Sequence, residues 1–563
     1  MNYQHRSEFF RSDIEGLRAV AILLVLAAHF ALPGMTAGFI GVDIFFVISG
    51  YLITSILLRE YESRGRITLS TFYANRLRRL LPALATMLIF SSVAAYFVIP
   101  STQLTPQASA AASAAFWISN IFFTFSDANY FAGENSTNAF LHTWSLGVEE
   151  QFYLLWPLLI LISMGTLKNH AQRDRNLAIF FAIIAATSAV LCLVLIERWP
   201  TFSFYMMPTR AWQFAFGALT CVTTKNNKLR TATSNLMGMA GVFLLALGLF
   251  LISPTSSYPG YLAALPTLAT CAWLWSGSLN GGMTHRILSL APMQWIGRMS
   301  YAWYLWHWPI IIIGEYLIPI RGEYANTIFA MGLSLLLAIA THHLVEQPIR
   351  FGKLKHIPAK WQITAATFAM ILMNSQLIRW STINEQNIDG MNTNKYVAAS
   401  HDIPFFYHDG CDDWYLSDTL KPCIYGHDSA KKKAVLLGDS IGAQWFPTLT
   451  SMFDPAEWKI IVLTKSSCPI VDESFFYQRI GREYTECSSW RDKAINWIKD
   501  ENVDMLFIGT VASNPFSDDE WTGGTLRILE KLTDVPAIYL IESSPALGFH
   551  GPDCLLKNQS KSL

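Results

Sequence analysis

Apolar stretches long enough to cross a bilayer recur along the chain up to about residue 380, and this constrains the fold more than any other feature. A membrane-spanning helix needs about 20 mostly apolar residues. We therefore expect a multi-pass α-helical membrane domain with about ten or eleven spans. The stretches lie near residues 17–33, 38–57, 80–99, 147–164, 177–196, 209–223, 235–253, 259–277, 299–318, 325–345 and 361–379.

The composition agrees with the bilayer as the main solvent. Of 563 residues, 52% are hydrophobic and only 15% are charged, whereas soluble proteins carry about 25% charged residues. The formal net charge is zero, which gives no reason to expect nucleic acid as a partner. The polar first residues lack the short apolar core and cleavage site of a secretory signal peptide, so we expect the first span to remain as an anchor.

Lysine and arginine alternate between loops as expected for the two sides of a membrane, because cytoplasmic loops retain these residues. The loop after the second stretch is rich in arginine, whereas residues 100–149 contain neither Lys nor Arg. Later basic groups, at 168–175, 225–230 and 350–360, fall on the same side as the first. The pattern predicts a cytoplasmic N-terminus and an external location for everything after Arg379.

Arg18 and His29 lie inside the first apolar stretch. Ionisable groups in hydrocarbon are costly, which suggests a functional role. On one helix the eleven-residue step makes about three turns, so both side chains share a face, roughly 16 Å apart along the axis. A neutral imidazole can remove a proton and a cation can stabilise an oxyanion. A guanidinium and an imidazole would then share one buried pathway.

A second group of candidates lies at the external edge of the fourth stretch. His142 precedes the paired carboxylates Glu149 and Glu150. The carboxylates are interpreted either as partners of the helix dipole or as functional charges at the membrane interface. His142 is either an ordinary interfacial loop residue or an accessory group for an acceptor.

The arginines of the third stretch and a histidine in an aromatic-rich span also allow two interpretations each. Arg76, Arg78 and Arg79 lie at the cytoplasmic end of the third stretch. The positive-inside rule explains them, and a guanidinium cluster also suits a polyphosphate such as that of coenzyme A. His307, in an aromatic-rich span, is more simply a histidine satisfied by neighbouring helices, with an accessory role as the alternative.

From about Trp380 the sequence predicts a soluble α/β domain. Short strand-like stretches (AVLLG, IIVLT, DMLFIG and AIYLI) alternate with the helical patterns SWRDKAINWIKDE and GGTLRILEKLTD, which is typical of parallel βαβ units. In an oxidising compartment Cys411 with Cys423, and Cys468 with Cys487, are plausible disulfides. Cys554 would remain unpaired, and ordinary buried thiols are the alternative.

The segment KKKAVLLGDSIGAQWFPTL combines a strand, a sharp turn and a helix start. Gly438, Asp439 and Ser440 form the turn, where backbone N–H groups at the helix terminus would stabilise an oxyanion at Ser440. An ordinary turn with an N-cap is the alternative. The strand before and the helix after the turn favour a nucleophile.

Taken in order, the membrane motifs resemble the acyltransferase-3 family over about residues 10–350. They are Arg18 with His29, GVDIFFVISGYLIT, RLRRLLP, HTWSLGVEEQFYLLWP, YLWHWP and VEQP. The resemblance implies a domain that takes an acyl group, usually acetyl, from cytoplasmic acyl-CoA and delivers it to a sugar on the far side. Arg18 and His29 match the family's functional pair, and Arg76, Arg78 and Arg79 match its basic cluster. For the transfer that this resemblance implies, we expect His29 to be the general base and Arg18, nearer the cytoplasm, to orient the donor.

The GDS turn is similar to the nucleophile block of SGNH hydrolases, a domain that commonly follows the acyltransferase-3 domain. This implies catalytic roles for Ser440 and Asp439. The sequence departs from that pattern in two places. Val511 stands where an oxyanion asparagine would follow Gly509, and Asp553 is followed three positions later by Leu556 instead of the histidine of an Asp-x-x-His motif. We therefore expect the SGNH-like domain to be incomplete at its C-terminus, with its base unidentified.

Three regions are predicted: a membrane acyltransferase domain (10–350), a further span with a linker (351–400) and an external SGNH-like domain (401–563). The expected function is O-acyl transfer, without a metal, from acetyl-CoA to a glycan such as lipopolysaccharide O-antigen. The expected location is a bacterial inner membrane, with the N-terminus cytoplasmic and the C-terminal domain periplasmic. The acyl group passes either through Ser440 or directly to the glycan. A transporter or flippase, and a glycan acyl-esterase, are the alternatives.

Overall fold

The chain folds into two compact units, Met1–Asn387 and Ile388–Leu563. The structure is a computed structural model. It describes residues 11–126, 137–164, 170–225, 231–253, 256–279, 282–318, 320, 324–390, 403–477, 480, 482–511 and 516–543.

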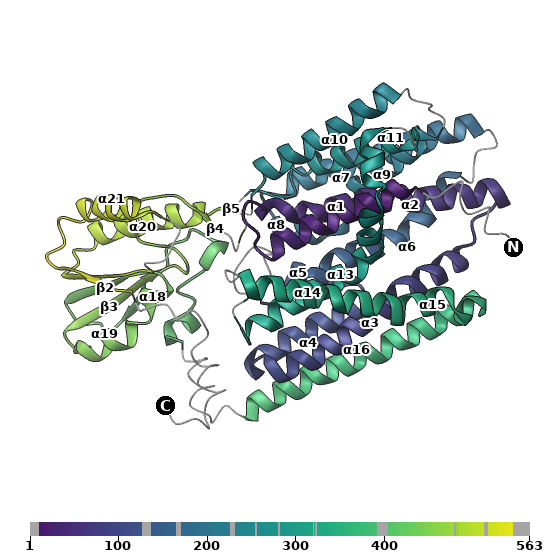
Figure 1. Cartoon of the computed structure of the whole chain (residues 1–563). Helices are drawn as coiled ribbons and strands as arrows, with labels where there is room; N and C mark the ends of the chain where they lie inside the picture. The colour runs from purple at the N-terminus through teal and green to yellow at the C-terminus, as the bar shows by residue number, and fades with distance from the viewer. Residues whose placement is uncertain are drawn as a thin grey trace. The chain divides into compact units, whose positions relative to one another are not determined.

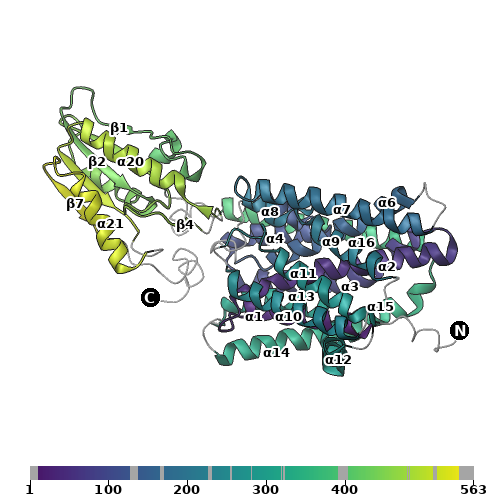
Figure 2. The ribbon, with the colours of Figure 1, turned by 90° about the horizontal axis from the view of Figure 1, so that it is seen from above.

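The first unit is a bundle of helices, and a helix overlaps each predicted apolar stretch (Figure 1). Seen from above, α13 lies between α7 on one side of the bundle and α14 on the other (Figure 2). The expectation of a multi-pass helical membrane domain is confirmed. The overlapping helices are α1 (Ser12–His29), α2 (Gly41–Arg64), α3 (Leu69–Val98), α6 (Trp144–Met164), α7 (His170–Leu195), α9 (Met207–Thr224), α10 (Thr231–Leu251), α11 (Ala264–Ser276), α13 (Ala291–Glu315), α14 (Tyr324–Thr341) and α16 (Ala359–Gly390).

Six of the described helical segments are long and apolar enough, by length and composition, to cross a membrane: Thr36–Arg64, Leu69–Val98, Leu141–Met164, Gln172–Leu195, Thr231–Leu251 and Tyr324–His356. Helix α1 is less apolar because its 18 residues include Asp13, Glu15 and Arg18. Helix α11 has only 13 residues, which span about 20 Å against a hydrocarbon core of about 30 Å. The stretch predicted at 259–277 is therefore shorter than a full span, because the chain turns around Gly260 before the helix begins.

Helix α4 (Ser101–Ala115) lies in a segment that the sequence predicts as a loop. It is rich in alanine and serine, so it has no long apolar run, yet it packs against α16. The side chain of Asn374 donates to the backbone oxygen of Ala112 at 2.9 Å, and Asn384 donates to that of Ser101 at 2.8 Å. The remaining short helices of this unit are α5 (Ser119–Phe125), α8 (Pro200–Tyr205), α12 (Met283–Leu288), α15 (Gln347–Phe351) and the π-helical turn His342–Glu346.

Two glycines allow the central helices to approach closely. A Cβ atom at Gly297 of α13 would overlap the backbone oxygen of Glu15 in α1, and one at Gly217 of α9 would overlap that of Val47 in α2. Small residues at such crossings are how membrane helices gain close contact. The pairs α1 with α13 and α2 with α9 are therefore fixed relative to one another.

A buried ion pair joins α2 to α9. Arg210 Nη1 lies 3.0 Å from Asp43 Oδ1, and both side chains are only 2% exposed. Tyr258 donates to the other carboxylate oxygen at 2.5 Å, and Gln213 also donates to this carboxylate. Arg210 Nε donates to the backbone oxygen of Phe204 at 3.0 Å. The pair is thus almost fully hydrogen-bonded, which a buried charge requires.

The second unit contains a five-stranded mixed sheet in the order β1-β3-β2-β6-β7. Strands β2 (Lys432–Gly438), β3 (Trp458–Thr464), β6 (Met505–Gly509) and β7 (Ile538–Ile541) are parallel, which confirms the βαβ expectation. The edge strand β1 (Cys423–Tyr425) is antiparallel, and β4 (Phe476–Tyr477) pairs with β5 (Arg482–Glu483). Sequence patterns missed these three because they have only two or three residues each.

Helices cover both faces of this sheet (Figure 1). Val435 and Leu437 of β2 pack in one core with α20 (Thr485–Asp500) and α21 (Asp518–Glu530). Ala434 and Leu436 pack in the other core with α19 (Phe446–Met452). Alternating residues of β2 therefore serve two cores, as a strand buried on both faces requires.

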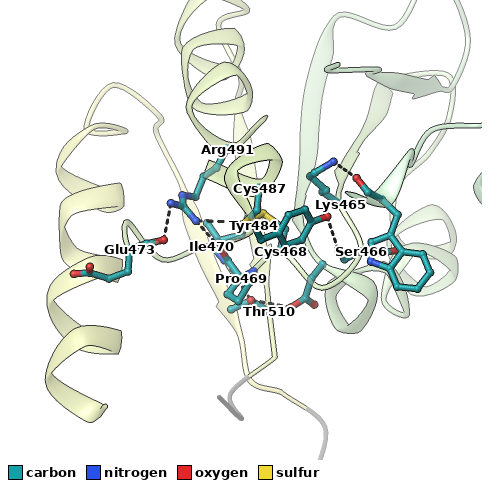
Figure 3. Close-up of a disulfide and its surroundings, with 12 residues drawn as sticks. Lys465, Ser466, Cys468, Pro469, Ile470, Glu473, Tyr484, Cys487, Arg491 and Thr510 are labelled. Atoms are coloured by element: carbon teal, nitrogen blue, oxygen red, sulfur yellow. Dashed lines mark hydrogen bonds between the residues drawn. A yellow bond between two sulfur atoms is a disulfide. The ribbon is translucent and has the colours of Figure 1, made fainter. Parts of the chain in front are cut away.

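Both predicted disulfides are confirmed, Cys411–Cys423 and Cys468–Cys487, while Cys554 lies outside the described residues. Figure 3 shows the second disulfide, which joins the segment after β3 to the start of α20. Arg491 of α20 donates to the backbone oxygens of Pro469 at 3.2 Å and Glu473 at 3.0 Å. Burial lowers the pKa of Arg491. The disulfide and this guanidinium together fix the loop to the helix.

Replacing Cys468 and Cys487 together with serine is expected to lower the free energy of unfolding of the second unit by about 3 kcal/mol, because the loop it closes is 19 residues long. Urea-dependent proteolysis of the full chain measures this loss. Cys221→Ser in the first unit, where the thiol is free, is the matched control. Equal urea resistance of the double variant and the unmodified chain would contradict the prediction.

Candidate active site

A cavity among α1, α2, α3, α6 and α13 brings three arginines together. Arg18, Arg76 and Arg79 line it with Glu149 and Tyr304, and its volume is about 80 Å³. Pockets that enclose drug-sized ligands measure about 300–1,000 Å³. The cavity is therefore large enough for a short acyl group or a few polar atoms, but not for a whole nucleotide.

Three of the charged side chains around this cavity contact other residues in different ways. Arg18 Nη1 lies 2.9 Å from Glu15 Oε2, one turn earlier on α1. Arg76 lies over the Tyr153 ring, 5.0 Å from its centroid. Glu149 accepts hydrogen bonds from Ser49 and Tyr153.

Two of the predicted charged residues differ in position from the rest. Glu150 does not line the cavity but interacts electrostatically with Arg76 and Arg79. Arg78 also lies outside the cavity lining. Its guanidinium donates to Gln362 Oε1 of α16 at 2.9 Å and to Asn75 Oδ1 at 2.8 Å. The arginine cluster thus divides into two side chains at the cavity and one that holds α16.

Three predicted histidines meet in the bundle interior. His29 Nδ1 lies 2.8 Å from His307 Nε2, and the two rings are stacked with centroids 5.1 Å apart. His307 Nδ1 lies 2.6 Å from the backbone oxygen of Tyr304. The His142 ring packs edge-on against His307 at 5.6 Å, and its nitrogens have no hydrogen-bond partner among the described residues. These contacts form a histidine cluster of His29, His142 and His307.

Tyr304 connects the cavity to the histidine cluster. Its hydroxyl donates to the backbone oxygen of His142 at 2.8 Å and lies 2.7 Å from Ser145 Oγ. Ser145 and Tyr304 both line the cavity. The histidine cluster therefore lies directly behind one wall of the cavity, while Arg18 lines the cavity itself, about 16 Å along α1 from His29.

In the second unit Ser440 is exposed and begins the short helix α18 (Ser440–Ala443) directly after β2. Strand β2 lies between β3, which follows it in the chain, and β6, which comes later. The chain therefore leaves β2 at a topological switch point, the place where open α/β sheets bind ligands at the carboxyl ends of their strands. The position suits a reactive side chain.

Asp439 is the cap of this turn. Its buried carboxylate accepts from the backbone N–H groups of Ile441 at 2.8 Å and Val511 at 2.8 Å, and from Thr510 Oγ1 at 3.1 Å. Gly442 N–H also donates to it at 3.4 Å. Burial raises the pKa of Asp439, and these donors oppose the rise.

The turn has the geometry of an N-cap, the alternative interpretation of this motif. Backbone N–H groups at the helix terminus were expected to stabilise an oxyanion at Ser440, and two of them, those of Ile441 and Gly442, donate to Asp439. Val511, one of the two departures from the SGNH pattern, donates its backbone N–H to the same carboxylate. Thr510 also accepts from the Ile470 N–H beside the disulfide at 3.3 Å (Figure 3). Asp553 and Leu556 lie outside the described residues.

Sequence reasoning missed the residues that connect these features. These residues carry no charge, and the sequence around them is typical of ordinary helices. They are Ser49, Ser145, Tyr153 and Tyr304. The spacing of Tyr304 three positions before His307 was the only available signal. Among the described residues, no group of three His, Cys, Asp or Glu side chains is arranged to hold a metal ion.

Comparison with known proteins shows that the chain matches two protein families and several curated relatives. Residues 11–343 match the family described as an acyltransferase domain (Acyl_transf_3), and residues 408–562 match the SGNH domain that is fused to AT3 domains. No solved structure matches the chain.

The relatives include three named O-acetyltransferases. The putative peptidoglycan O-acetyltransferase YrhL of Bacillus subtilis is 31% identical over 369 residues, which cover 62% of this chain and 56% of the relative. Peptidoglycan O-acetyltransferase OatA of Listeria monocytogenes is 30% identical over 347 residues, 60% and 55% respectively. O-acetyltransferase OatA of Staphylococcus aureus is 30% identical over 378 residues, 64% and 61%. The chain thus spans less than two thirds of the length of each of these relatives.

Proposed function

Because the chain belongs to the acyltransferase-3 family and carries the SGNH domain fused to it, we propose that it is a membrane O-acyltransferase that acetylates a glycan of the cell wall or cell surface. The observation that carries this proposal is the histidine cluster behind an arginine-lined cavity in one helical bundle. Acetyl is the proposed group because the relatives are named O-acetyltransferases. Peptidoglycan, the polymer named for two relatives, is the proposed acceptor, in preference to the O-antigen of lipopolysaccharide.

Acetyl-CoA is the proposed donor, and the arginines are the proposed contacts for its phosphates. A guanidinium forms planar, bidentate hydrogen bonds with phosphate oxygens. Arg76 and Arg79 lie near the start of α3, which follows a basic loop. The positive-inside rule assigns that loop to the cytoplasm, where acyl-CoA is found. Arg18, on the same cavity, is the third proposed contact.

His29 is the proposed general base. It accepts the proton of the attacking hydroxyl while that oxygen bonds to the thioester carbonyl carbon. The carbon–sulfur bond then breaks, and the protonated imidazole returns the proton to the leaving thiolate. The products are an O-acetyl ester and a free thiol, so protons and electron pairs balance without a metal or a redox step.

The SGNH domain gives the acetyl group two routes. In the relay, the first nucleophile is Ser440, and the sugar hydroxyl attacks the resulting ester in a second step. In direct transfer, the hydroxyl attacks within the membrane domain. The exposed position of Ser440 at the switch point favours the relay.

The proposed location is a bacterial inner membrane, with the second unit in the periplasm. The two disulfides support an oxidising compartment for that unit. The distribution of Lys and Arg supports a cytoplasmic N-terminus. The bilayer is then both the solvent of the first unit and the barrier across which acetyl is delivered.

The test is complementation of cells that lack their own O-acetyltransferase with the full chain. Mild alkali releases ester-linked acetate, which is measured separately in purified peptidoglycan and in lipopolysaccharide. We expect acetate on peptidoglycan. Acetate on lipopolysaccharide alone would change the acceptor, and acetate on neither polymer would overturn the proposed function.

Ser440→Ala is expected to abolish acetylation if the relay operates, because the acyl-serine intermediate is then missing. Ser451→Ala, at an exposed serine of α19 whose hydroxyl donates to the backbone oxygen of Thr448 at 2.7 Å, is the matched control and is expected to be fully active. The same acetate assay reads out both variants. Full activity of Ser440→Ala would establish direct transfer.

Arg79→Gln is expected to raise the KM for acetyl-CoA about 10- to 100-fold, because each hydrogen bond to a charged group contributes about 1.5–3 kcal/mol. Arg78→Gln is the neighbouring control, since Arg78 binds Gln362 and not the cavity, and we expect less than a threefold change. Transfer from radiolabelled acetyl-CoA in membrane vesicles measures both. Equal effects of the two variants would rule out a donor site at the cavity.

A further inference from the structure

We propose that His307 is a positioning residue that holds His29 in the tautomer with a proton on Nδ1 and a lone pair on Nε2. The inference assigns His307 a part in the proposed acyl transfer and therefore deepens that function. It follows from the direction of two hydrogen bonds. Neither bond involves an arginine.

The first bond fixes the proton on His307. A backbone carbonyl only accepts hydrogen bonds. The 2.6 Å contact between His307 Nδ1 and the Tyr304 oxygen therefore places a proton on Nδ1. The carbonyl has a second lone pair, so it can accept this bond in addition to the helical bond within α13.

The second step concerns the charge of His307. Its side chain is 0% exposed, and in the described part of the chain no carboxylate hydrogen-bonds to it. A buried imidazolium without a paired anion is costly. His307 is therefore neutral, and with its proton on Nδ1 its Nε2 is an acceptor.

The proton position on His29 follows. His29 Nδ1 lies 2.8 Å from the acceptor Nε2 of His307, so His29 Nδ1 carries the proton in this contact. In a neutral imidazole the other nitrogen, Nε2, then holds the lone pair. A general base needs that lone pair, and the bond to His307 determines which ring nitrogen presents it.

Packing holds the His29 ring in this orientation. The His29 and His307 rings are nearly parallel, with an angle of 3° between their planes. Trp308 contacts His29 edge-on at 4.8 Å. The close approach of α1 and α13 at Gly297 fixes the two backbones that carry the histidines. His307 therefore acts through His29 and not on the substrate.

Two variants of similar volume separate this role from simple packing. In His307→Gln the amide oxygen can still accept the His29 Nδ1 proton, whereas His307→Leu has no acceptor. We expect kcat for acetyl transfer to fall about 10- to 100-fold in the leucine variant, by analogy with the loss of a hydrogen-bond partner that orients a metal-ligating histidine, and less than threefold in the glutamine variant. The KM for acetyl-CoA should not change, because His307 does not line the cavity.

A direct measurement of the tautomer makes the test independent of activity. Nitrogen-15 NMR of the histidine-labelled full chain in lipid distinguishes Nδ1–H from Nε2–H, and comparison with His29→Gln identifies the His29 signals among the 13 histidines. We expect Nδ1–H in the unmodified chain and in His307→Gln, and a growing Nε2–H signal in His307→Leu. Thermal unfolding of each variant checks that it is folded.

The outcomes distinguish the two proposals. An Nε2–H signal from His29 in the unmodified chain, or identical spectra for the leucine and glutamine variants, would overturn the positioning role. The expected spectra in a chain that transfers no acetyl would support the positioning role and overturn the proposed function.

Discussion

Replacing His29 with glutamine is expected to reduce glycan O-acetylation about 10²- to 10⁴-fold, the contribution usually made by a general base. The variant keeps a polar side chain of similar size at a buried position, so the helix pair α1 and α13 should still pack. What it loses is the basic ring nitrogen. Ester-linked acetate per unit of membrane-inserted protein is the measurement.

The matched control is His356→Gln, because that imidazole is exposed in the 3₁₀ turn Lys353–His356, away from the histidine cluster. We expect it to be fully active. If His29→Gln also retained normal acetylation, the base would have to lie elsewhere, and the reading of α1 as the reactive helix would fail. A loss in both variants would indicate a general folding defect.

The second large effect is expected from the buried ion pair of α2 and α9. Arg210→Leu leaves the Asp43 carboxylate without its cation in the bundle interior, and breaking such a pair costs about 3–5 kcal/mol. We expect a lower thermal unfolding temperature and a lower level of the protein in membranes. Asp43 keeps its bonds from Tyr258 and Gln213, but these do not replace the lost charge.

The double variant Asp43→Leu with Arg210→Leu tests the cause of this loss. It removes both charges, so it should regain part of the lost stability, as buried pairs replaced by apolar side chains often do. Arg198→Gln, at an exposed arginine, is the control and should unfold normally. A double variant less stable than Arg210→Leu alone would show that packing, and not the uncompensated charge, dominates at this position.

Sequence patterns that lie within a single helix, strand or loop predicted much of the fold. Apolar runs located the helices because hydrocarbon requires a fully hydrogen-bonded backbone over about 20 residues. The spacing of Cys468 and Cys487, and the strand before Ser440, likewise predicted local contacts. Helix α4 was missed because it is rich in alanine and serine and has no long apolar run, although one of its faces is buried in the bundle.

Contacts between distant elements could not be predicted. Arg76, Arg78 and Arg79 are equivalent under the positive-inside rule, and only packing shows that Arg78 binds Gln362 while the others face the cavity. His29 and His307 are 278 positions apart, and no single-sequence signal links them. The simpler interpretation of His307, a histidine that hydrogen-bonds to its neighbours, agrees with its two contacts in the structure. That interpretation did not include an effect of His307 on the tautomer of His29.

The continuity of α1 has a consequence for which donors can react. Arg18 and His29 belong to one uninterrupted helix that is packed closely against α13. The distance between the two residues is therefore set by the helical rise per residue and does not depend on a conformational change. A donor held by its phosphates at Arg18 must therefore carry its thioester on an arm long enough to reach His29. Analogues with the same phosphates and a shortened arm should bind and inhibit without being consumed. Donor selection would then depend on molecular length as much as on affinity.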